Sequence, residues 1–343
     1  MNKRPPSLND VATLAGVSTG TVSRAISKPH LLTEKTRKRV FEAINQLRYV
    51  PNGAARALAM KRTLTVGAVV PRFGSSGFST LLQALENELT DAGYTLLLSA
   101  PDHKRAQDIN PIATLLERGV DALAILGYED RPDIFTSLND QGVPFIRLWA
   151  PQNSPWPSIG FDEHQAAELM VDYLYGLGHR KIAFIGGKIA HNERARERQE
   201  GIMLALSSRN MSLPSDARIE SDYGFQEGFD AMQQLISRSC DFTAVICGND
   251  YLAAGAISAL HVNDISVPGK ISVAGFNDND FSAFLNPALT TIRLPIEEMG
   301  RNAAHYLLTH LDKAMIPLPM ELPVSLVKRA STGPATIQNS QAC

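Results

Sequence analysis

Residues 7–27 read SLNDVATLAGVSTGTVSRAIS, a pattern that predicts two short helices joined by a tight turn. Ser7, followed three residues later by Asp10, gives the pattern of a capping box at the start of the first helix. Gly16 is suited to the left-handed conformation that ends a helix, and Ser18 is a favoured N-cap for the next one. Two helices joined by a turn of this kind are typical of a helix-turn-helix.

A third helix follows in the same N-terminal unit. Thr33 is a favoured N-cap, and the apolar residues from Val40 to Leu47 recur at helical spacing beside basic residues. The sequence therefore predicts an all-α N-terminal domain over residues 1–51, with the helix-turn-helix at about residues 8–27.

Charge is distributed very unevenly along the chain. Residues 1–62 carry twelve Lys and Arg residues against three Asp and Glu residues, a net charge of +9. The whole chain of 343 residues carries −2, so the remainder carries −11. Such an asymmetry indicates that the N-terminal piece binds a polyanion. A basic, solvated helical face is the alternative, because charge also sets solubility.

Residues 52–62, NGAARALAMKR, form a short alanine-rich segment between the two parts of the chain. Alanine favours helix, but helices shorter than about 12 residues are marginal in water. We therefore expect a hinge helix that forms when a partner helix or a nucleic acid supports it.

From residue 63 onward, apolar runs typical of buried parallel strands alternate with helical stretches. The expected strands are 66–70, 94–99, 122–126, 145–148, 182–185, 244–247 and 271–274, and the clearest helices are 81–92, 164–177 and 250–260. This alternation predicts an α/β fold with parallel, doubly wound sheets. Residues 63–330 exceed what one such sheet needs, so we expect two lobes with a ligand between them at the carboxyl ends of the strands. Residues 331–343 are polar and aperiodic, and we expect a flexible tail.

Several classes of protein find no support in the sequence. No run approaches the roughly 20 apolar residues that span a bilayer, and no apolar segment follows Lys3 and Arg4 as in a secretory signal. Three cysteines without metal-ligand spacing fit a reducing compartment. The histidines are scattered, and neither a phosphate-binding loop nor a nucleophile elbow is present. We therefore expect a cytoplasmic protein with no membrane contact, metal, cofactor or catalytic site.

Short motifs along almost the whole chain resemble those of the lactose-repressor/galactose-repressor (LacI/GalR) family. In the N-terminal part they are LNDVA at 8–12, AGVS at 15–18, TVSR at 21–24 and NGAARAL at 52–58. In the remainder they are GHRKIA at 178–183, RQEG at 198–201, GND at 248–250, ISVAGF at 271–276 and LTTI at 289–292. The resemblance implies a helix-turn-helix headpiece and a two-lobed core like that of periplasmic sugar-binding proteins. It also implies a sequence-specific DNA-binding regulator, most often a repressor, controlled by a small metabolite.

The resemblance implies that the second helix enters the major groove of DNA, where each base pair shows a distinct pattern of donors and acceptors. Thr19, Gly20 and Arg24 then take the base-reading positions. Phosphate contacts, which position the protein, fall to Ser18, Thr21 and Ser23. Gly20 is a departure, because it has no side chain with which to read a base. Either the backbone approaches more closely there, or discrimination shifts to the neighbouring positions, or the glycine only relieves a steric conflict.

In the hinge, the resemblance gives Leu58 the role of an apolar wedge that enters the minor groove and kinks the duplex. Asn52, Ala55 and Arg56 complete the expected hinge contacts, with Arg56 placed near phosphates. Small alanines would let two such helices approach closely. An ordinary linker with a buried leucine is the alternative.

The effector-binding positions implied by the family are Arg72, Phe78, Trp149, Phe161, Arg198, Tyr223, Asn249 and Asn277. Arg198 offers a fixed fork of donors, the amide of Asn249 both donates and accepts, and aromatic faces pack on a sugar ring. Asn277 stands where the family commonly has aspartate, so the site carries less negative charge. The expected effector is a sugar, a sugar acid or a sugar phosphate. Arg72 together with Arg198 would suit a sugar acid or a sugar phosphate, whereas the alternative is that Arg72 pairs with a surface acid.

We expect a homodimer that places two headpieces on a pseudo-palindromic operator in double-stranded DNA. The tail shows no leucine heptad, so the tetramerising helix found in one branch of the family is not expected. The sequence leaves open whether the effector releases the operator or promotes its binding. The competing class is a small-molecule-binding protein or enzyme with an incidental basic N-terminus. Steep salt dependence of DNA binding distinguishes a DNA-binding protein from that class.

Overall fold

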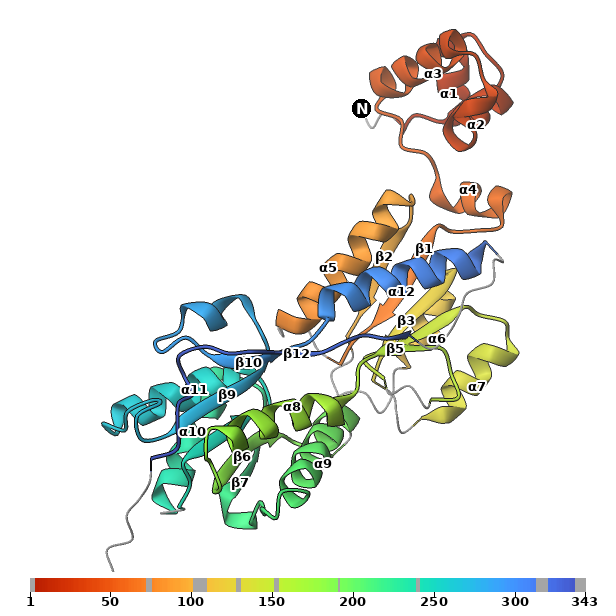
Figure 1. Ribbon diagram of the computed structural model, residues 1–343. Helices are drawn as coiled ribbons and strands as arrows, with labels where there is room; N and C mark the ends of the chain where they lie inside the picture. Colours follow the sequence, from red (N-terminus) through yellow and green to blue (C-terminus); the bar gives the residue numbers. More distant parts are fainter. Residues whose placement is uncertain are drawn as a thin grey trace, which may run out of the picture. The chain divides into compact units, whose positions relative to one another are not determined.

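The computed structural model describes residues 4–71, 76–100, 110–127, 131–150, 154–190, 192–238, 241–312 and 320–336. The chain divides into two compact units, Met1–Thr65 and Val66–Cys343 (Figure 1). We call the first unit the headpiece and the second the core, and each is described by itself. No helix within the described ranges is long and apolar enough to cross a membrane.

The headpiece contains the predicted helices. They are α1 (Leu8–Ala15), α2 (Thr19–Ser27), a 3-10 turn (Pro29–Leu31), α3 (Glu34–Leu47) and α4 (Gly53–Met60). The capping box is confirmed, because Ser7 and Asp10 each bond to the other's backbone N–H. Gly16 ends α1 with φ +61°, in the left-handed region, and Ser18 caps α2 by accepting from the N–H of Thr21.

Small and β-branched side chains from α1, α2 and α3 form the apolar centre of the headpiece. Val11, Val22 and Val40 are fully buried there, with Ala15 and Ala25 between the helices. Alanines at the contacts let short helices approach closely, and the cluster fixes which face of α2 points outward. The outward face of α2 is therefore determined by packing and not by propensity.

The first lobe of the core is a parallel sheet with strand order β11-β5-β4-β3-β1-β2. Its strands are β1 (Thr65–Val69), β2 (Thr95–Ser99), β3 (Ala122–Leu126), β4 (Phe145–Leu148), β5 (Ser158–Gly160) and β11 (Met320–Glu321). Its helices are α5 (Ser76–Asp91), α6 (Pro111–Glu117), α7 (Pro132–Asp140) and α12 (Ile296–Leu311). Every residue of β3 and of β4 is buried, as expected for strands covered by helices on both faces.

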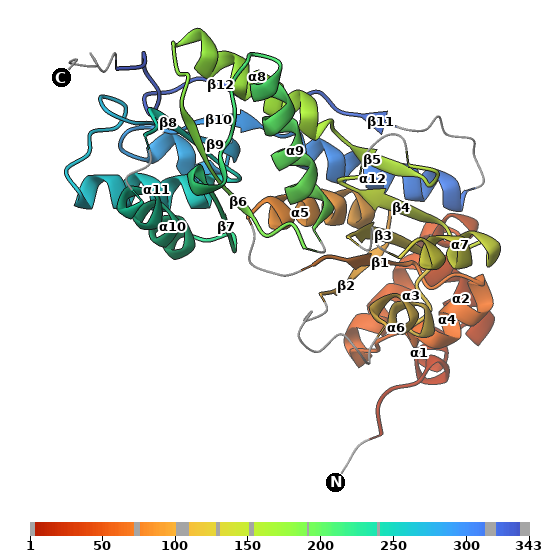
Figure 2. The ribbon, with the colours of Figure 1, turned by 90° about the horizontal axis from the view of Figure 1, so that it is seen from below.

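The second lobe repeats this architecture with strand order β12-β10-β9-β8-β6-β7. Its strands are β6 (Ile182–Gly187), β7 (Arg218–Ser221), β8 (Ala244–Cys247), β9 (Ser272–Asn277), β10 (Thr290–Arg293) and β12 (Ser325–Val327). Its helices are α8 (Glu163–Gly176), α9 (Glu193–Ser207), α10 (Phe225–Ser237) and α11 (Asp250–Val262), with 3-10 turns at Ser215–Ala217 and Asp280–Phe284. The β10–β12 pair is antiparallel, and the other pairs are parallel. Figure 2 shows the two sheets as separate lobes.

Three segments cross between the lobes: β5 to α8, β10 to α12, and β11 to β12. Each lobe is therefore built from segments that are discontinuous in the sequence. The crossings bring the residues that follow β4, β6, β8 and β9 to one junction. The predicted two-lobed, doubly wound α/β architecture is confirmed.

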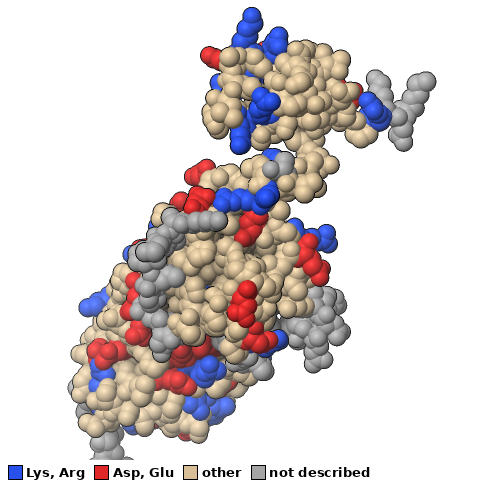
Figure 3. Space-filling view, turned by 90° about the vertical axis from the view of Figure 1, so that its right-hand side faces the viewer, with Lys and Arg blue, Asp and Glu red and all other residues tan. Residues whose placement is uncertain are grey.

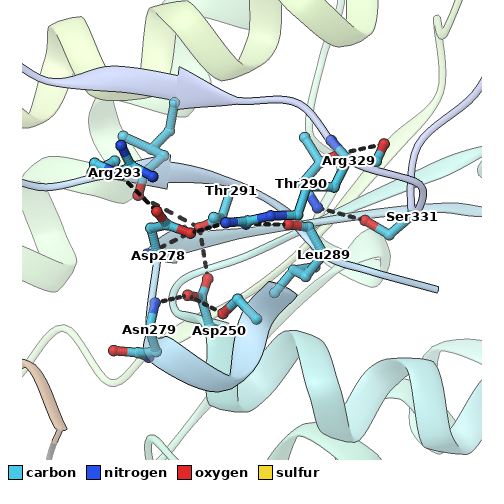
Figure 4. A network of polar contacts seen from close by, with 11 residues as sticks. Asp250, Asp278, Asn279, Leu289, Thr290, Thr291, Arg293, Arg329 and Ser331 are labelled. Atoms are coloured by element: carbon cyan, nitrogen blue, oxygen red, sulfur yellow. Dashed lines mark hydrogen bonds and ion pairs between the residues drawn. The ribbon is translucent and has the colours of Figure 1, made fainter. Parts of the chain in front are cut away.

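The expectation of a flexible tail from residue 331 is wrong for residues 331–336. Ser331 is fully buried, and its hydroxyl donates to the carbonyl of Val273 (2.6 Å) and accepts from the N–H of Thr290 (2.8 Å) (Figure 4). Further along, Gly333 accepts through its carbonyl from the His179 imidazole, and Ala335 donates to Leu177. Polar residues without periodicity resemble a tail in sequence, but here they complete hydrogen bonds of buried strands. Residues 337–343 lie outside the described residues.

Candidate functional site

The outer face of α2 carries the predicted DNA-reading residues. Thr19, Gly20, Ser23 and Arg24 are exposed, as is the cap Ser18, whereas Thr21 is half-buried. The opposite face is anchored in the headpiece core by Val22 and Ala25. The helix thus presents small polar groups and one long cation on a surface that a duplex can approach.

Gly20 lies under the Arg24 side chain. A Cβ at Gly20 would lie 3.9 Å from Nη2 of Arg24 and 3.8 Å from Oγ of Ser18, both ordinary van der Waals contacts. The Ser18 hydroxyl is already engaged, since it lies 3.0 Å from Oγ1 of Thr21 and accepts from the Thr21 N–H. Arg24, in the last turn of α2, is the long polar side chain whose guanidinium lies beside Gly20 in the first turn.

Further basic side chains are exposed on the headpiece. Arg37, Lys38 and Arg39 on α3 are exposed, and Figure 3 shows Lys and Arg side chains over the headpiece with few acidic ones among them. Asp10, one of the three acids within residues 1–62, pairs with Arg4 at 3.1 Å. Hydrogen bonds from Ser7 and the charge of Arg4 hold the pKa of Asp10 below its usual value. The surface has the charge that a phosphate backbone requires.

The α4 helix of the hinge segment exposes most of its side chains. Asn52 caps the helix by accepting from the N–H groups of Ala54 (3.0 Å) and Ala55 (3.2 Å). Leu58 is 84% exposed, and Arg56 is also exposed. An exposed leucine on a two-turn helix has no packing role within the headpiece, so the alternative of a buried linker leucine is wrong.

The lobe junction brings together seven of the predicted effector-binding residues. With Glu163 they form what we call the junction cluster: Phe78, Trp149, Phe161, Arg198, Tyr223, Asn249 and Asn277. The ring of Trp149, which follows β4, lies 6.0 Å from that of Phe78 and 5.4 Å from that of Phe161, centroid to centroid. Gly77 of α5 fits between lobes, since a Cβ there would lie 3.8 Å from Trp149 and 3.7 Å from the amide nitrogen of Asn277. Arg72, the eighth predicted residue, lies outside the described residues.

Arg198 forms a buried ion pair with Glu163, a residue that the sequence did not single out. Its Nε donates to Oε2 (2.9 Å) and its Nη2 to Oε1 (2.7 Å), while Nη1 donates to the carbonyl of Gly248. The guanidinium also lies over the ring of Phe276, 4.6 Å from its centroid. Burial opposes the charge, but the Glu163 carboxylate outweighs it and raises the pKa of Arg198. The sequence gives no sign of this pair. Glutamates are common in the first turn of a helix because they interact favourably with the helix dipole, so Glu163 does not stand out.

Tyr223 lies against the ends of β6 and β8. A Cβ at Gly187 would collide with its ring, and one at Gly248 would lie 3.4 Å from it. Burial raises the pKa of Tyr223 above its ordinary value, so its hydroxyl stays protonated near neutral pH. The glycines after β6 and β8 therefore make room for an aromatic face at the junction.

The two predicted asparagines differ in how they are used. Asn249 caps α11, accepting from the N–H of Leu252 at 2.9 Å. Asn277, at the end of β9, has φ +110°, and its Oδ1 is buried without a hydrogen-bond partner among the described residues. A buried acceptor without a partner is costly, so this oxygen is suited to receive a donor from a ligand.

The loop after Asn277 is held by a polar network that the sequence did not reveal (Figure 4). Asp278 accepts from Nη2 of Arg329 (2.6 Å) and Nε of Arg293 (2.7 Å). Asp250 accepts from the hydroxyls of Thr291 (2.6 Å) and Ser282 (2.7 Å), and from the backbone of the same loop. Burial raises the pKa of Asp250 to about 6 despite these bonds. The network holds the backbone of the loop that directly follows Asn277.

Comparison with known proteins was made over the whole chain. Residues 7–52 match a family model described as bacterial regulatory proteins of the lacI family, and residues 171–332 match a periplasmic binding protein-like domain. The ribose operon repressor of Escherichia coli K12 is 32% identical over 327 residues, which are 94% of this chain and 99% of that protein.

Solved structures of similar proteins support the same family. A lac repressor dimer bound to operator and an anti-inducer superposes with a TM-score of 0.85 at 29% identity, covering 96% of this chain and 100% of that one. A LacI family regulator from Enterococcus faecium with bound ribose gives 0.70 at 30% identity, covering 79% and 100%. Among the described residues, no group of three or more His, Cys, Asp or Glu side chains is placed to hold a metal ion. This chain belongs to the lacI family of bacterial transcriptional regulators.

Proposed function

We propose that the protein is a repressor that binds an operator through its headpiece as a homodimer and senses a small metabolite at its lobe junction. It acts by binding and not by catalysis, in the cytoplasm. The relatives support this proposal: the lac repressor was solved as an operator-bound dimer, and the Enterococcus faecium regulator with ribose.

The observation that carries the proposal is the outer face of α2. Arg24 reaches along the first turn over Gly20, and together with Thr19 it reads base edges in the major groove. Ser18, Thr21 and Ser23 contact phosphates, which fix the register of the helix without specifying sequence. Because Gly20 contributes no side chain, discrimination rests on Thr19 and Arg24.

Residues 52–62, near the C-terminal end of the headpiece, act as the hinge that leads in sequence from the helix-turn-helix domain (residues 1–51) to the effector-binding core. Leu58, which is 84% exposed, inserts between base pairs in the minor groove. Asn52 secures the start of the hinge helix, Ala55 permits close approach of the partner's helix, and Arg56 contacts phosphates. The helix is short, so operator contact and a partner helix stabilise it.

The effector binds at the junction cluster, where residues of both lobes meet. A ligand that contacts both lobes stabilises one lobe arrangement over another and so shifts the population of the DNA-binding state.

The experiment is to select operators from a random duplex pool with the full-length protein, and then measure affinity against salt by fluorescence anisotropy. We expect a pseudo-palindromic consensus and a steep fall in affinity with salt, as counterions are released. Arg24→Ala should cost about 1–3 kcal/mol and relax specificity at one position in each half-site. Arg301→Ala is a matched control, because Arg301 is an exposed arginine on α12, paired with Glu297. Weak binding without a consensus would instead favour the competing class, a small-molecule-binding protein or enzyme.

A further inference from the structure

Glu163 occupies the centre of the junction cluster. Its carboxylate is buried, with the residue only 3% exposed. Oε1 accepts from the indole Nε1 of Trp149 at 3.0 Å and from Nη2 of Arg198 at 2.7 Å, and Oε2 accepts from Nε of Arg198 at 2.9 Å. Trp149 belongs to the first lobe, whereas Glu163 and Arg198 belong to the second. One carboxylate therefore sets the orientation of two predicted effector-binding side chains from different lobes.

This arrangement removes Arg198 as a free positive charge. All three of its guanidinium nitrogens donate to protein oxygens, two nitrogens to Glu163 and one to the carbonyl of Gly248. The pair is bidentate and buried, a geometry in which both charges are satisfied mutually. An anionic ligand would have to replace Glu163 as the partner of Arg198, leaving that carboxylate buried and unpaired, which is strongly unfavourable.

The rest of the described junction offers no unopposed cation. Arg194, the next cation that acts on Tyr223, has an interaction of its own and is not free, and the next charged group that acts on Arg198 is the acid Asp250. Asn277 offers a buried amide oxygen without a partner, which accepts from a hydroxyl and repels a carboxylate or phosphate oxygen. Trp149, Phe161 and Tyr223 supply aromatic faces.

We propose that Glu163 determines the charge of the effector: by neutralising Arg198 and fixing Trp149, it restricts the site to uncharged, hydroxyl-bearing ligands and rejects sugar acids and sugar phosphates. This inference rests on the proposed role of the junction as the effector site. Glu163 acts on the ligand through Arg198 and Trp149, so it is a positioning residue.

The test uses Glu163→Gln in the full-length protein, with inorganic phosphate as the anionic probe. Glutamine preserves the shape and can still accept a hydrogen bond, but it leaves Arg198 with an unopposed charge. Thermal melting is followed in phosphate and in chloride at equal ionic strength. We expect Glu163→Gln to gain a saturable phosphate stabilisation, with apparent affinity at least about tenfold tighter than that of the wild type. Adding Arg198→Gln should abolish the gain.

Glu168→Gln is the matched control, since Glu168 is an exposed acid on the same helix, 3.6 Å from Arg209. It should respond to phosphate as the wild type does, including any binding of phosphate to the basic headpiece. A Glu163→Gln protein that folds but gains no phosphate response would overturn the proposal. So would a wild type that already binds phosphate through Arg198.

A second measurement needs only proteins with Glu163 intact. Wild type and Arg198→Gln are melted with ribose, ribose 5-phosphate, glucose and gluconate. The part of each melting-temperature rise that is lost in Arg198→Gln measures the contribution of Arg198. The proposal requires that this part is no larger for ribose 5-phosphate than for ribose, and no larger for gluconate than for glucose. A larger Arg198-dependent rise with either anion overturns it. Operator binding is measured in a separate experiment. A protein that binds no operator would overturn the proposed function, but the melting experiments would still test the role of Glu163.

Discussion

Glu197 on α9 should make the stability of the core depend on pH, and the substitution Glu197→Gln tests this. Burial, followed by the negative charges of Glu193 and Glu163, raises the pKa of Glu197 from 4.5 to about 7, with Arg196 acting in the opposite sense. An acid whose pKa is higher in the folded protein ionises more readily when the chain is unfolded. Ionisation therefore favours unfolding, and the cost grows between pH 4.5 and about 7 and is constant above that range.

The magnitude follows from the size of the shift. At 1.36 kcal/mol per pKa unit, the full difference would correspond to about 3 kcal/mol. Glu197 is only half-buried, and solvent screening reduces this to about 1 kcal/mol. Glutamine cannot ionise, so the variant should be more stable than the wild type by about this amount at pH 8. Its advantage should shrink toward zero as the pH falls to about 4.

The assay is urea unfolding of the core transition at pH 5 and pH 8, for the wild type, Glu197→Gln and Glu200→Gln. Glu200 is an exposed acid on the same helix, so its replacement controls for the loss of one negative charge. The gain should be specific to Glu197 and larger at pH 8. An equal gain at both pH values, or the same gain for Glu200→Gln, would refute the reasoning.

Three further substitutions test the headpiece, the hinge and the end of the chain. Gly20→Ala should stabilise the headpiece by about 0.5–1 kcal/mol, because the added Cβ meets only ordinary contacts; lower stability in urea unfolding would contradict this. Leu58→Gly should weaken operator binding in anisotropy, whereas Leu31→Gly, at another exposed leucine of the headpiece, should not. An unchanged operator affinity for Leu58→Gly would rule out the wedge. Ser331→Ala should destabilise the core by about 1–3 kcal/mol, because it leaves a buried backbone N–H without a partner. Ser325→Ala, at an exposed position, should leave the melting temperature unchanged, and equal losses would contradict the buried role.

Local features of the fold could be predicted from the sequence because their causes lie within a few residues. The capping box of Ser7 and Asp10, the turn at Gly16 and the fully apolar strands β3 and β8 are of this kind. The strands that the pattern missed are short or polar. In β10, Thr290 and Thr291 are fully buried, which hydropathy alone opposes. Their hydroxyls are satisfied by residues about 40 positions away in the sequence, and no local pattern shows this.

Separation in the sequence also explains why the role of Glu163 at the lobe junction could not be predicted. The family resemblance gave Trp149 and Arg198 as effector-binding positions, but it did not show that Glu163, 35 residues before Arg198, binds both. Each side chain was therefore judged by its own chemistry, and Arg198 together with Arg72 made a sugar acid or a sugar phosphate one of the candidate effectors. Under the proposal for Glu163, the pairing removes the contribution of Arg198 to that inference, because the charge that a ligand meets belongs to the pair and not to either residue.

Two contacts between the lobes would have to change in any movement of one lobe relative to the other. Trp149 donates to Glu163 at 3.0 Å, and Nη2 of Arg147 lies 3.6 Å from Oε2 of Glu193, with the first residue of each pair in the first lobe. Rotation that separates the lobes would lengthen both contacts and would take from the Trp149 indole N–H the acceptor that it has here. A ligand that replaces Glu163 as the partner of Trp149 removes that cost and favours the rotated state. A ligand that binds beside the intact contacts adds to them and favours the present state. A ligand with equal affinity for both states shifts nothing, so the response of operator affinity to a ligand reports which of these contacts it replaces.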